Sequence, residues 1–279
     1  MFEIAAAAAI TQGNDWFVVK PALEKSIAWQ NGATLLFTIL SIAILFYAHR
    51  LAKRHGSSYP YWVVLGSALA TYYEPLGDFL AHVTYHEVNQ INFTTAFGFM
   101  TPLWVLPCYI VFFGYPILWL GEVITKDVSM GKWMGLFFAA FVSAWFFEVP
   151  ILAMGATEYY GANQPFKLLN YPLWMGFANT ATMFVVAAAV HHLKSTDVFA
   201  RMPVLFAAVL PMLVTGANAG TALPLGSAIN STSDTMITNA MAVLSMALAL
   251  LYTWIAGTLV VDKSGATVEA TFRTAASRT

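Results

Sequence analysis

Residues 237–261 read ITNAMAVLSMALALLYTWIAGTLVV, and this stretch decides the class of fold. It contains no charged side chain and exceeds the length of about 20 apolar residues that a helix needs to cross a bilayer. Composition extends this observation to the whole chain. Of the 279 residues, 59% are hydrophobic and 10% are charged, whereas soluble domains average about 25% charged residues. The sequence therefore predicts an integral membrane protein.

Seven apolar stretches are long enough to span a membrane, and the links between them are short. By residue number they are 33–52, 61–83, 101–122, 133–155, 171–193, 200–220 and 237–261. The sixth is the least regular, because prolines and glycines interrupt it at Pro203, Pro211, Gly216 and Gly220. The prediction is an all-α polytopic protein with one domain of seven transmembrane helices at 33–261, and without a soluble catalytic domain.

The distribution of lysine and arginine predicts the orientation in the membrane. One set of loops holds ten of these residues, and the other set holds only Lys20, Lys25 and Lys167. Because cytoplasmic loops are enriched in Lys and Arg, the N-terminus is expected outside and the C-terminus in the cytoplasm, in the inner (plasma) membrane of a cell. Residues 1–32 are expected to form an interfacial segment and residues 262–279 a disordered cytoplasmic tail.

Charge and composition also narrow the partners. The net charge of −1 gives no indication of a nucleic-acid partner, and the one cysteine, Cys108, rules out an internal disulfide framework. Aromatic residues make up 15% of the chain, enough for interfacial belts and for an aromatic-lined cavity. The expected partners are membrane lipids and a lipophilic small-molecule substrate, and the composition is compatible with a homo-oligomer.

A row of polar residues interrupts the second apolar stretch, where residues 72–86 read YYEPLGDFLAHVTYH. Glu74, Asp78, His82 and His86 recur every four residues, so a helix would place them along one slowly drifting face. A charged group at the centre of a membrane helix costs about 2.5–3.5 kcal/mol on insertion scales. The row therefore needs a functional or structural reason.

Two kinds of chemistry fit this row. A protonated carboxyl in a dry, aromatic pocket is a usable acid, so Glu74 is the candidate general acid and Asp78, oriented by His82, the candidate base or proton relay. That interpretation needs no metal and no cofactor. Alternatively, Asp78, His82 and His86 could bind zinc, iron or copper, as in a metal-dependent oxygenase or hydrolase. Hydrogen bonding between packed helices is the structural alternative.

A faint internal repeat supplies a further carboxyl. YYEP at 72–75 is echoed by FFEVP at 146–150, and PLW at 102–104 recurs at 172–174. A duplicated helix pair with a parallel relation would place the two glutamates on either side of one cavity. The predicted catalytic set therefore includes Glu148, and the candidate substrate-binding residues are Tyr73, Trp104, Trp145, Trp174 and Asn179.

Three short elements carry a resemblance to a known family: EPLGD at 74–78, FGFMTPLW at 97–104 and YIVFFG at 109–114. In their order they resemble the spirocyclase AveC-like family of bacterial membrane proteins. An arginine follows the Phe-Gly pair in that family, where this chain has Phe99. The resemblance implies acid–base chemistry on a lipophilic, polyketide-like substrate, namely dehydration and ring closure.

The preferred hypothesis is a membrane-embedded enzyme for acid–base cyclisation, dehydration or isomerisation of a lipophilic polyketide- or terpenoid-like substrate. Intramembrane carboxyls beside a repeat and a broken sixth span are also typical of proton-coupled transporters. The metal-dependent oxygenase or hydrolase and a membrane binding subunit are the remaining alternatives.

Overall fold

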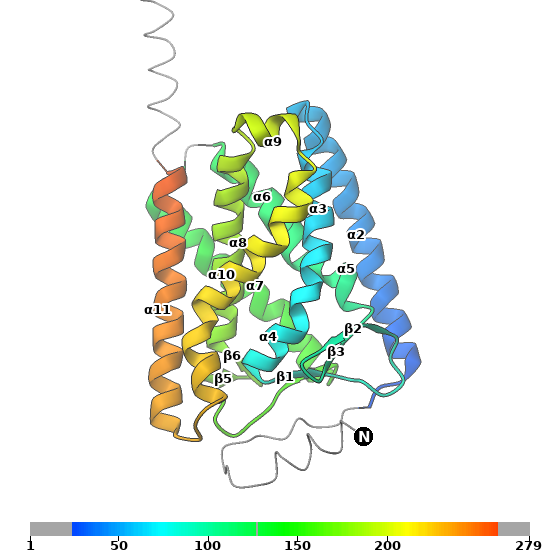
Figure 1. The fold of residues 1–279 in the computed structure, drawn as a ribbon, viewed down its shortest axis with the longest axis vertical. Helices are drawn as coiled ribbons and strands as arrows, with labels where there is room; N and C mark the ends of the chain where they lie inside the picture. Colours follow the sequence, from blue (N-terminus) through cyan, green and yellow to red (C-terminus); the bar gives the residue numbers. More distant parts are fainter. Residues whose placement is uncertain (1–23, 127, 262–279) are drawn as a thin grey trace, which may run out of the picture.

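Long apolar helices form the body of the protein, as the computed structural model of residues 24–126 and 128–261 shows (Figure 1). Within those residues, six helices are long and apolar enough to cross a membrane: α2 (Ile27–His55), α5 to α6 (Val105–Ile124), α7 (Met130–Ala153), α8 (Leu173–Leu193), α10 (Leu205–Ile229) and α11 (Thr235–Val260). The prediction of a helical multi-pass membrane protein is confirmed in this form. The predicted tail 262–279 and residues 1–23 of the predicted interfacial segment lie outside the described residues.

The second predicted stretch, 61–83, is divided into three consecutive elements. They are α3 (Tyr59–Leu69), the 3₁₀ segment η1 (Ala70–Tyr73) and α4 (Glu74–Ala81). Pro75 has no backbone N–H, so the regular α-helical bond to the carbonyl of Thr71 is absent where the helix changes form. No one of the three elements has the length of a membrane span. Together they run from the end of the bundle that carries α9 (Asp197–Arg201) to the end that carries the strands (Figure 1).

The predicted helical row of four polar residues is wrong beyond Asp78. Helix α4 ends at Ala81, and His82 adopts a left-handed backbone with φ 50° and ψ 53°. The chain then enters strand β1 (Val83–Tyr85), so His86 lies past the strand rather than on the helix. The reason is a tertiary contact: the carbonyl of His82 accepts the N–H of Tyr160 at 2.9 Å, which directs the backbone into a strand pair.

Three small antiparallel sheets lie together at one end of the bundle, and the all-α prediction did not include them (Figure 1). Strand β1 pairs with β4 (Thr157–Tyr159), β2 (Asn92–Ala96) with β3 (Phe99–Pro102), and β5 (Lys167–Leu168) with β6 (Tyr171–Pro172). The third and fifth predicted spans therefore began too early, because Pro102 and Pro172 belong to strands that precede the helices.

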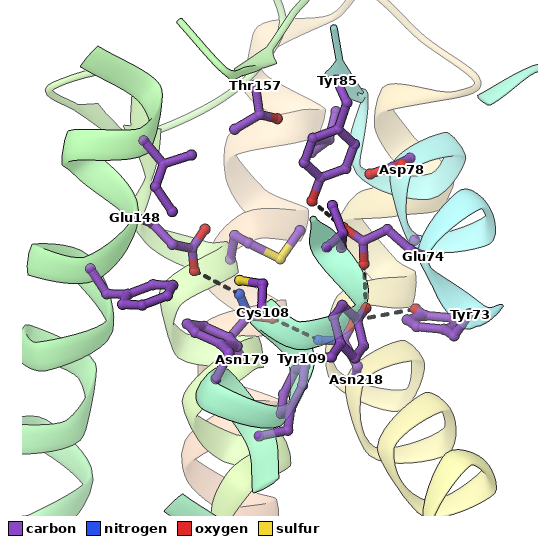
Figure 2. A pocket seen from close by; sticks show the side chains of 18 of the residues that line it. Tyr73, Glu74, Asp78, Tyr85, Cys108, Tyr109, Glu148, Thr157, Asn179 and Asn218 are labelled. Atoms are coloured by element: carbon purple, nitrogen blue, oxygen red, sulfur yellow. Dashed lines mark hydrogen bonds between the residues drawn. The ribbon is translucent and has the colours of Figure 1, made fainter. Parts of the chain in front are cut away.

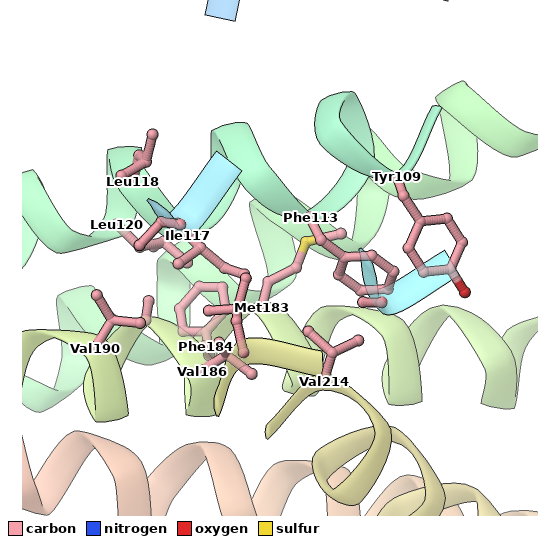
Figure 3. Close-up of a cluster of buried hydrophobic side chains, with 14 of the residues drawn as sticks. Tyr109, Phe113, Ile117, Leu118, Leu120, Met183, Phe184, Val186, Val190 and Val214 are labelled. Carbon is pink, nitrogen blue, oxygen red and sulfur yellow. The ribbon is translucent and has the colours of Figure 1, made fainter. Parts of the chain in front are cut away.

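Helix α8 lies at the centre of the packing, in contact with α6, α7, α10 and α11. Figure 3 shows one cluster at this centre, in which Phe113 and Ile117 lie near Phe184 of α8. Phe184 is fully buried. Because lipid tails are as apolar as these side chains, close van der Waals packing rather than transfer out of water holds such a core together.

The third span changes helical form at its middle. Between α5 (Val105–Tyr109) and α6 (Tyr115–Ile124) lies a π-helical segment, η2 (Ile110–Gly114). Pro116 lacks the N–H that an α-helix would donate to the carbonyl of Phe112. Such π-helical turns are frequent at functional sites, and this one borders the cavity described below.

Helix α10 begins later than the predicted 200–220, at Leu205, because residues 197–201 form a separate short helix, α9 (Asp197–Arg201). It also ends later, at Ile229. It tolerates two internal prolines, Pro211 and Pro224. Its contact with α3 is close: a Cβ added to Gly66 would lie 2.7 Å from Cβ of Leu210. Small residues permit such close helix approach in membrane proteins.

The end of the bundle that carries α9 has its own buried acid. Glu122 of α6 accepts a hydrogen bond from Nη1 of Arg54 at 3.0 Å, and its other oxygen lies 2.6 Å from Nε2 of His55. Both partners lie in the last turn of α2, so the group ties α2 to α6.

Candidate functional site

A cavity opens inside the bundle near the strand end, with about 110 Å³ open to the centre of a water molecule. A single water needs roughly 10–15 Å³ by that measure, so the cavity has room for several waters or for part of a small molecule. Its apolar wall includes Trp104, Phe112, Phe113 and Phe147. Its polar lining is Tyr73, Glu74, Asp78, Tyr85, Tyr109, Glu148, Thr157, Tyr159, Asn179 and Asn218 (Figure 2).

Glu74, the first residue of α4, is held by two phenols. The hydroxyl of Tyr85 donates to Oε1 and the hydroxyl of Tyr109 donates to Oε2. Tyr85 comes from strand β1 and packs edge-on against Trp104, with ring centroids 5.5 Å apart. Each carboxyl oxygen of Glu74 therefore faces a hydroxyl that can also accept a hydrogen bond.

Glu148 faces the cavity from α7 and has three donors. Its Oε1 accepts from the hydroxyl of Tyr171 at 2.9 Å and from Nδ2 of Asn179 at 3.1 Å. Its Oε2 accepts from the hydroxyl of Tyr159 at 3.3 Å. Unlike Glu74, Glu148 thus has an amide N–H among its partners, and an amide N–H can only donate.

A chain of hydrogen bonds joins the two sides of the cavity (Figure 2). Oδ1 of Asn179 accepts from Nδ2 of Asn218 at 3.0 Å, and Oδ1 of Asn218 accepts from the hydroxyl of Tyr73 at 3.2 Å. Tyr73 directly precedes Glu74 in the chain. Both carboxyls also line the same cavity. They therefore belong to one site rather than two.

The geometry supports the internal repeat. Each glutamate accepts a hydrogen bond from a tyrosine 11 residues later, Tyr85 in one case and Tyr159 in the other. Each also accepts from the seventh residue after the proline of a Pro-Leu-Trp sequence, which is Tyr109 in the first half and Asn179 in the second. Both glutamate helices therefore present their carboxyls to equivalent positions.

Strands β1 and β4 meet where the two halves join. Thr84 pairs with Glu158, and these two are separated by the same number of residues as Glu74 and Glu148. The flanking pairs are reciprocal, Val83 with Tyr159 and Tyr85 with Thr157. Reciprocal pairing of equivalent residues is what a two-fold axis produces. The strand pair therefore lies on a local pseudo-two-fold axis that places one glutamate on each side.

The two halves differ in their remaining polar groups. Asp78 is buried and lines the cavity on the Glu74 side, whereas the equivalent position in the second half is Leu152. Tyr73 corresponds in the same way to Phe147. The first half therefore carries an additional carboxyl and an additional hydroxyl.

Most of the predicted site residues come together in this cavity, and some do not. Glu74, Asp78, Glu148, Tyr73, Trp104 and Asn179 all line it. Trp145 and Trp174 are outside the lining, and Trp174 is buried in a neighbouring apolar cluster.

His82 also lies outside the lining and does not form the predicted pair with Asp78. Its Nε2 lies 3.1 Å from Oδ1 of Asn230, its Nδ1 has no hydrogen-bond partner, and its ring stacks on Tyr160 at 5.1 Å between centroids. His82 therefore fastens the end of α4 to α10 and to the loop after β4.

The metal-binding alternative does not fit the positions of its ligands. Within residues 24–126 and 128–261, no three His, Cys, Asp or Glu side chains are placed so that they could hold a metal ion. The row Asp78, His82, His86 fails because the helix that should have aligned it ends at Ala81.

Sequence reasoning missed the tyrosines that bind the carboxyls. The apolar pattern did not resolve the strands and the helix end that carry them. The four are Tyr85, Tyr109, Tyr159 and Tyr171. The equal spacing of Glu74 to Tyr85 and of Glu148 to Tyr159 was nevertheless visible in the sequence. It could have identified one tyrosine in each half.

Taken as chemistry, the cavity offers carboxyls, phenols and amides against aromatic faces. Such a set can donate and accept protons, and aromatic faces stabilise a developing cation. Comparison of the chain with protein-family models, with curated proteins and with solved structures finds no match.

Proposed function

We propose that this protein is a membrane-embedded enzyme that uses Glu74 and Glu148 for acid–base cyclisation, dehydration or isomerisation of a lipophilic polyketide- or terpenoid-like substrate. One observation carries the proposal: the two carboxyls line the same aromatic cavity but have different hydrogen-bond partners. Pairs of titratable groups in unequal environments are the usual basis for separate acid and base roles.

The partners assign the roles. Among the described residues, Glu74 accepts hydrogen bonds only from phenols. A phenol can turn from donor to acceptor, so a protonated Glu74 keeps its hydrogen bonds and acts as the general acid. Oε1 of Glu148 faces the amide N–H of Asn179, which suits an ionised carboxylate, so Glu148 acts as the base. Repulsion between two carboxylates in a cavity of low dielectric favours this singly protonated state.

In a dehydration, Glu74 gives its proton to a substrate hydroxyl, the carbon–oxygen bond breaks and water leaves. The aromatic wall stabilises the positive charge that remains on carbon. Glu148 then removes a proton from the adjacent carbon, whose bonding electrons form the double bond. The pair is left with the proton on Glu148, and the starting state returns when Glu148 releases that proton and Glu74 takes one up. In a ring closure, a second substrate oxygen attacks the cation and gives up its proton to Glu148.

The resemblance to the spirocyclase AveC-like family supports the same chemistry. Residues from all three resembling elements line the cavity, namely Glu74 and Asp78, Trp104, and Tyr109. Asp78 lies on the acid's side of the cavity and is proposed to supply protons to Glu74.

We further propose that α3, η1 and α4 together form a seventh span, the second along the chain. The concentration of Lys and Arg then places the α9 end in the cytoplasm and the strand end outside the plasma membrane. In this orientation the cavity lies toward the outer surface.

The test is a comparison of lipid extracts from cells that express wild type, Glu74→Gln, Glu148→Gln or Asp197→Asn, grown in deuterated water and analysed by mass spectrometry. We expect a product that has lost water or gained deuterium in wild type and in the exposed-site control Asp197→Asn, and its absence in both glutamine variants. A product that persists unchanged in both glutamine variants would overturn the proposal.

A second candidate, a proton-coupled carrier, is favoured by one observation: buried carboxyls at the junction of two parallel repeats. Proteoliposomes under an imposed proton gradient would then show substrate flux that Glu148→Gln abolishes. Equal flux in wild type, Glu148→Gln and empty liposomes would remove this candidate.

A further inference from the structure

A second hollow lies beside the cavity, at the end of the bundle that carries the strands, with about 220 Å³ open to the centre of a water molecule. Lys167, Glu158 and Asn170 contribute its polar lining. Thr157 and Tyr159 line both the hollow and the main cavity. The two spaces therefore adjoin each other at these two residues.

Both shared residues belong to strand β4. Successive side chains of a strand point to opposite faces, so Thr157 and Tyr159 face one way and Glu158 the other. The hydroxyl of Tyr159 reaches Glu148 inside the cavity, whereas Glu158 is exposed on the side of the hollow. A ligand in the hollow would thus lie one strand away from the proposed catalytic base.

The hollow carries an ammonium group with unused hydrogen-bonding capacity. Nζ of Lys167 donates to the backbone carbonyl of Tyr159 at 2.6 Å, which uses one of its three N–H donors. Among the described residues no carboxylate lies within 4.0 Å of it, because the ion pairs at that distance are those of Glu122. Burial lowers the pKa of Lys167 below its ordinary value, and the negative charge of Glu158 opposes that change.

A second lysine stands at the rim. Nζ of Lys25 lies 3.6 Å from where a Cβ on Gly155 would be, and Gly155 lines the hollow. The lining of the hollow thus holds the ammonium group of Lys167 and the carboxylate of Glu158, with a second ammonium group, that of Lys25, beside Gly155. An anion placed there would gain charge-assisted hydrogen bonds.

From this arrangement we propose that the hollow holds the anionic headgroup, a carboxylate or a phosphate monoester, of an amphiphilic substrate whose apolar part reaches the main cavity past Thr157 and Tyr159, which line both spaces. The inference rests on the proposed function, because it takes the cavity as the site of reaction. It adds the substrate class: an alkyl or isoprenoid-like chain that ends in an anion, which approaches from the membrane surface.

Three probes with one chain and different heads test this inference: octanoate, octyl phosphate and octanol. Their dissociation constants are measured by calorimetry on the full-length protein in a neutral detergent. We expect at least one of the two anions to bind wild type about tenfold more tightly than octanol does. Which anion binds more tightly distinguishes a carboxylate head from a phosphate head. Equal affinity for all three probes would overturn the inference.

Variants assign the effect to Lys167. Lys167→Gln should remove the preference for the anion, whereas Lys167→Arg, which keeps the charge and a donor for the carbonyl of Tyr159, should retain it. Lys132→Gln, an exposed lysine near the start of α7, is the matched control and should bind as wild type does. An anion preference that survives in Lys167→Gln, or one lost in Lys167→Arg at an unchanged Tm, would contradict the assignment.

The same titrations on Glu74→Gln and Glu148→Gln separate this inference from the proposed function. If Glu74→Gln and Glu148→Gln both keep the anion preference and both still form product as wild type does, the headgroup site stands and the acid–base proposal fails. If Lys167→Gln keeps the preference while the glutamine variants form no product, the chemistry stands and the headgroup site fails.

Discussion

Glu74 and Glu148 occupy equivalent places in two halves of the bundle, but the helices that carry them behave differently. In the first half a proline follows the glutamate directly, and the span divides into α3, η1 and α4 before it ends at Ala81. In the second half Pro150 lies two residues after the glutamate, and α7 continues to Ala153. Two halves of similar geometry thus hold the carboxyls in equivalent places, although the helices around them differ.

The divergence extends to the groups that bind the carboxyls. Where Tyr109 donates to Glu74, the equivalent Asn179 donates to Glu148, and only the asparagine continues through Asn218 to the other side. Equivalent geometry therefore supports unequal proton chemistry.

Replacement of either glutamate should have the largest effect. Glu74→Gln or Glu148→Gln removes one proton-transfer group, and general acid–base groups contribute about 10²–10⁴-fold to rate. We expect kcat to fall by that factor in each variant, measured as initial rates on the product identified by lipid profiling. Full activity in one variant would show that the two halves do not share the reaction.

Removal of a single phenol should lower the rate by different amounts at Glu74 and at Glu148. Tyr109→Phe takes away one of two donors to Glu74, whereas Tyr159→Phe takes away one of three donors to Glu148 and the longest, at 3.3 Å. Glu74 becomes a carboxylate as it gives up its proton in the proposed reaction, and a hydrogen bond to a charged group contributes about 1.5–3 kcal/mol. Tyr109→Phe should therefore lower kcat by about tenfold or more, and Tyr159→Phe by less. The reverse order in steady-state rates would contradict the roles assigned to the two carboxyls.

The free energy of unfolding should respond differently to the same substitution in α3 and in α7. Gly66→Ala introduces the residue found at the equivalent position of the second half, Ala140, but its Cβ would meet Leu210 at 2.7 Å. We expect a loss of about 1–3 kcal/mol in unfolding free energy. Gly135→Ala, where nothing lies within 4 Å, is the control and should be neutral or stabilising by up to about 1 kcal/mol. Denaturation in mixed micelles measures both, and a neutral Gly66→Ala would show that α3 and α10 can move apart.

The smallest effect is expected at the opposite end of the bundle. The side chain of Arg54 is 66% exposed, so its ion pair with Glu122 is screened by solvent. Arg54→Gln should cost about 0–1 kcal/mol, with a loss that shrinks further at high salt. A larger loss in Tm would mean that the α9 end, rather than the strand end, controls stability.

The helices of this fold could be predicted because each apolar run is long and nearly free of charge. The break in the second span could not be placed from hydropathy, since 61–83 is long enough to span and its polar residues are spaced as on one helical face. Only Pro75 marks the change. The end of α4 depends on contacts with residues far along the chain: His82 binds Asn230, and β1 pairs with β4. Such partners leave no local pattern, so the polar row looked longer than it is.

The candidate site could be predicted in part for the same reason. Glu74 and Glu148 were conspicuous because an intramembrane carboxyl is costly. Tyrosines are common at membrane interfaces, so Tyr85 and Tyr159 did not stand out until their equal spacing was compared between the halves. His82 was misassigned because four-residue spacing predicts a shared face only while the helix continues.

The π-helical segment η2 has a consequence for how this protein tolerates insertions and deletions. A π-helical turn holds one residue more than an α-helical turn, so the residues before it are rotated by about 100° relative to the residues after it. Deletion of one residue within 110–114 would restore α-helical geometry without removing any residue named as catalytic. Tyr109 would then turn away from Glu74 while Ile117 kept its place against α8. A change in chain length by a single residue would therefore remove the Tyr109 hydrogen bond from Glu74 and leave the packed core unchanged.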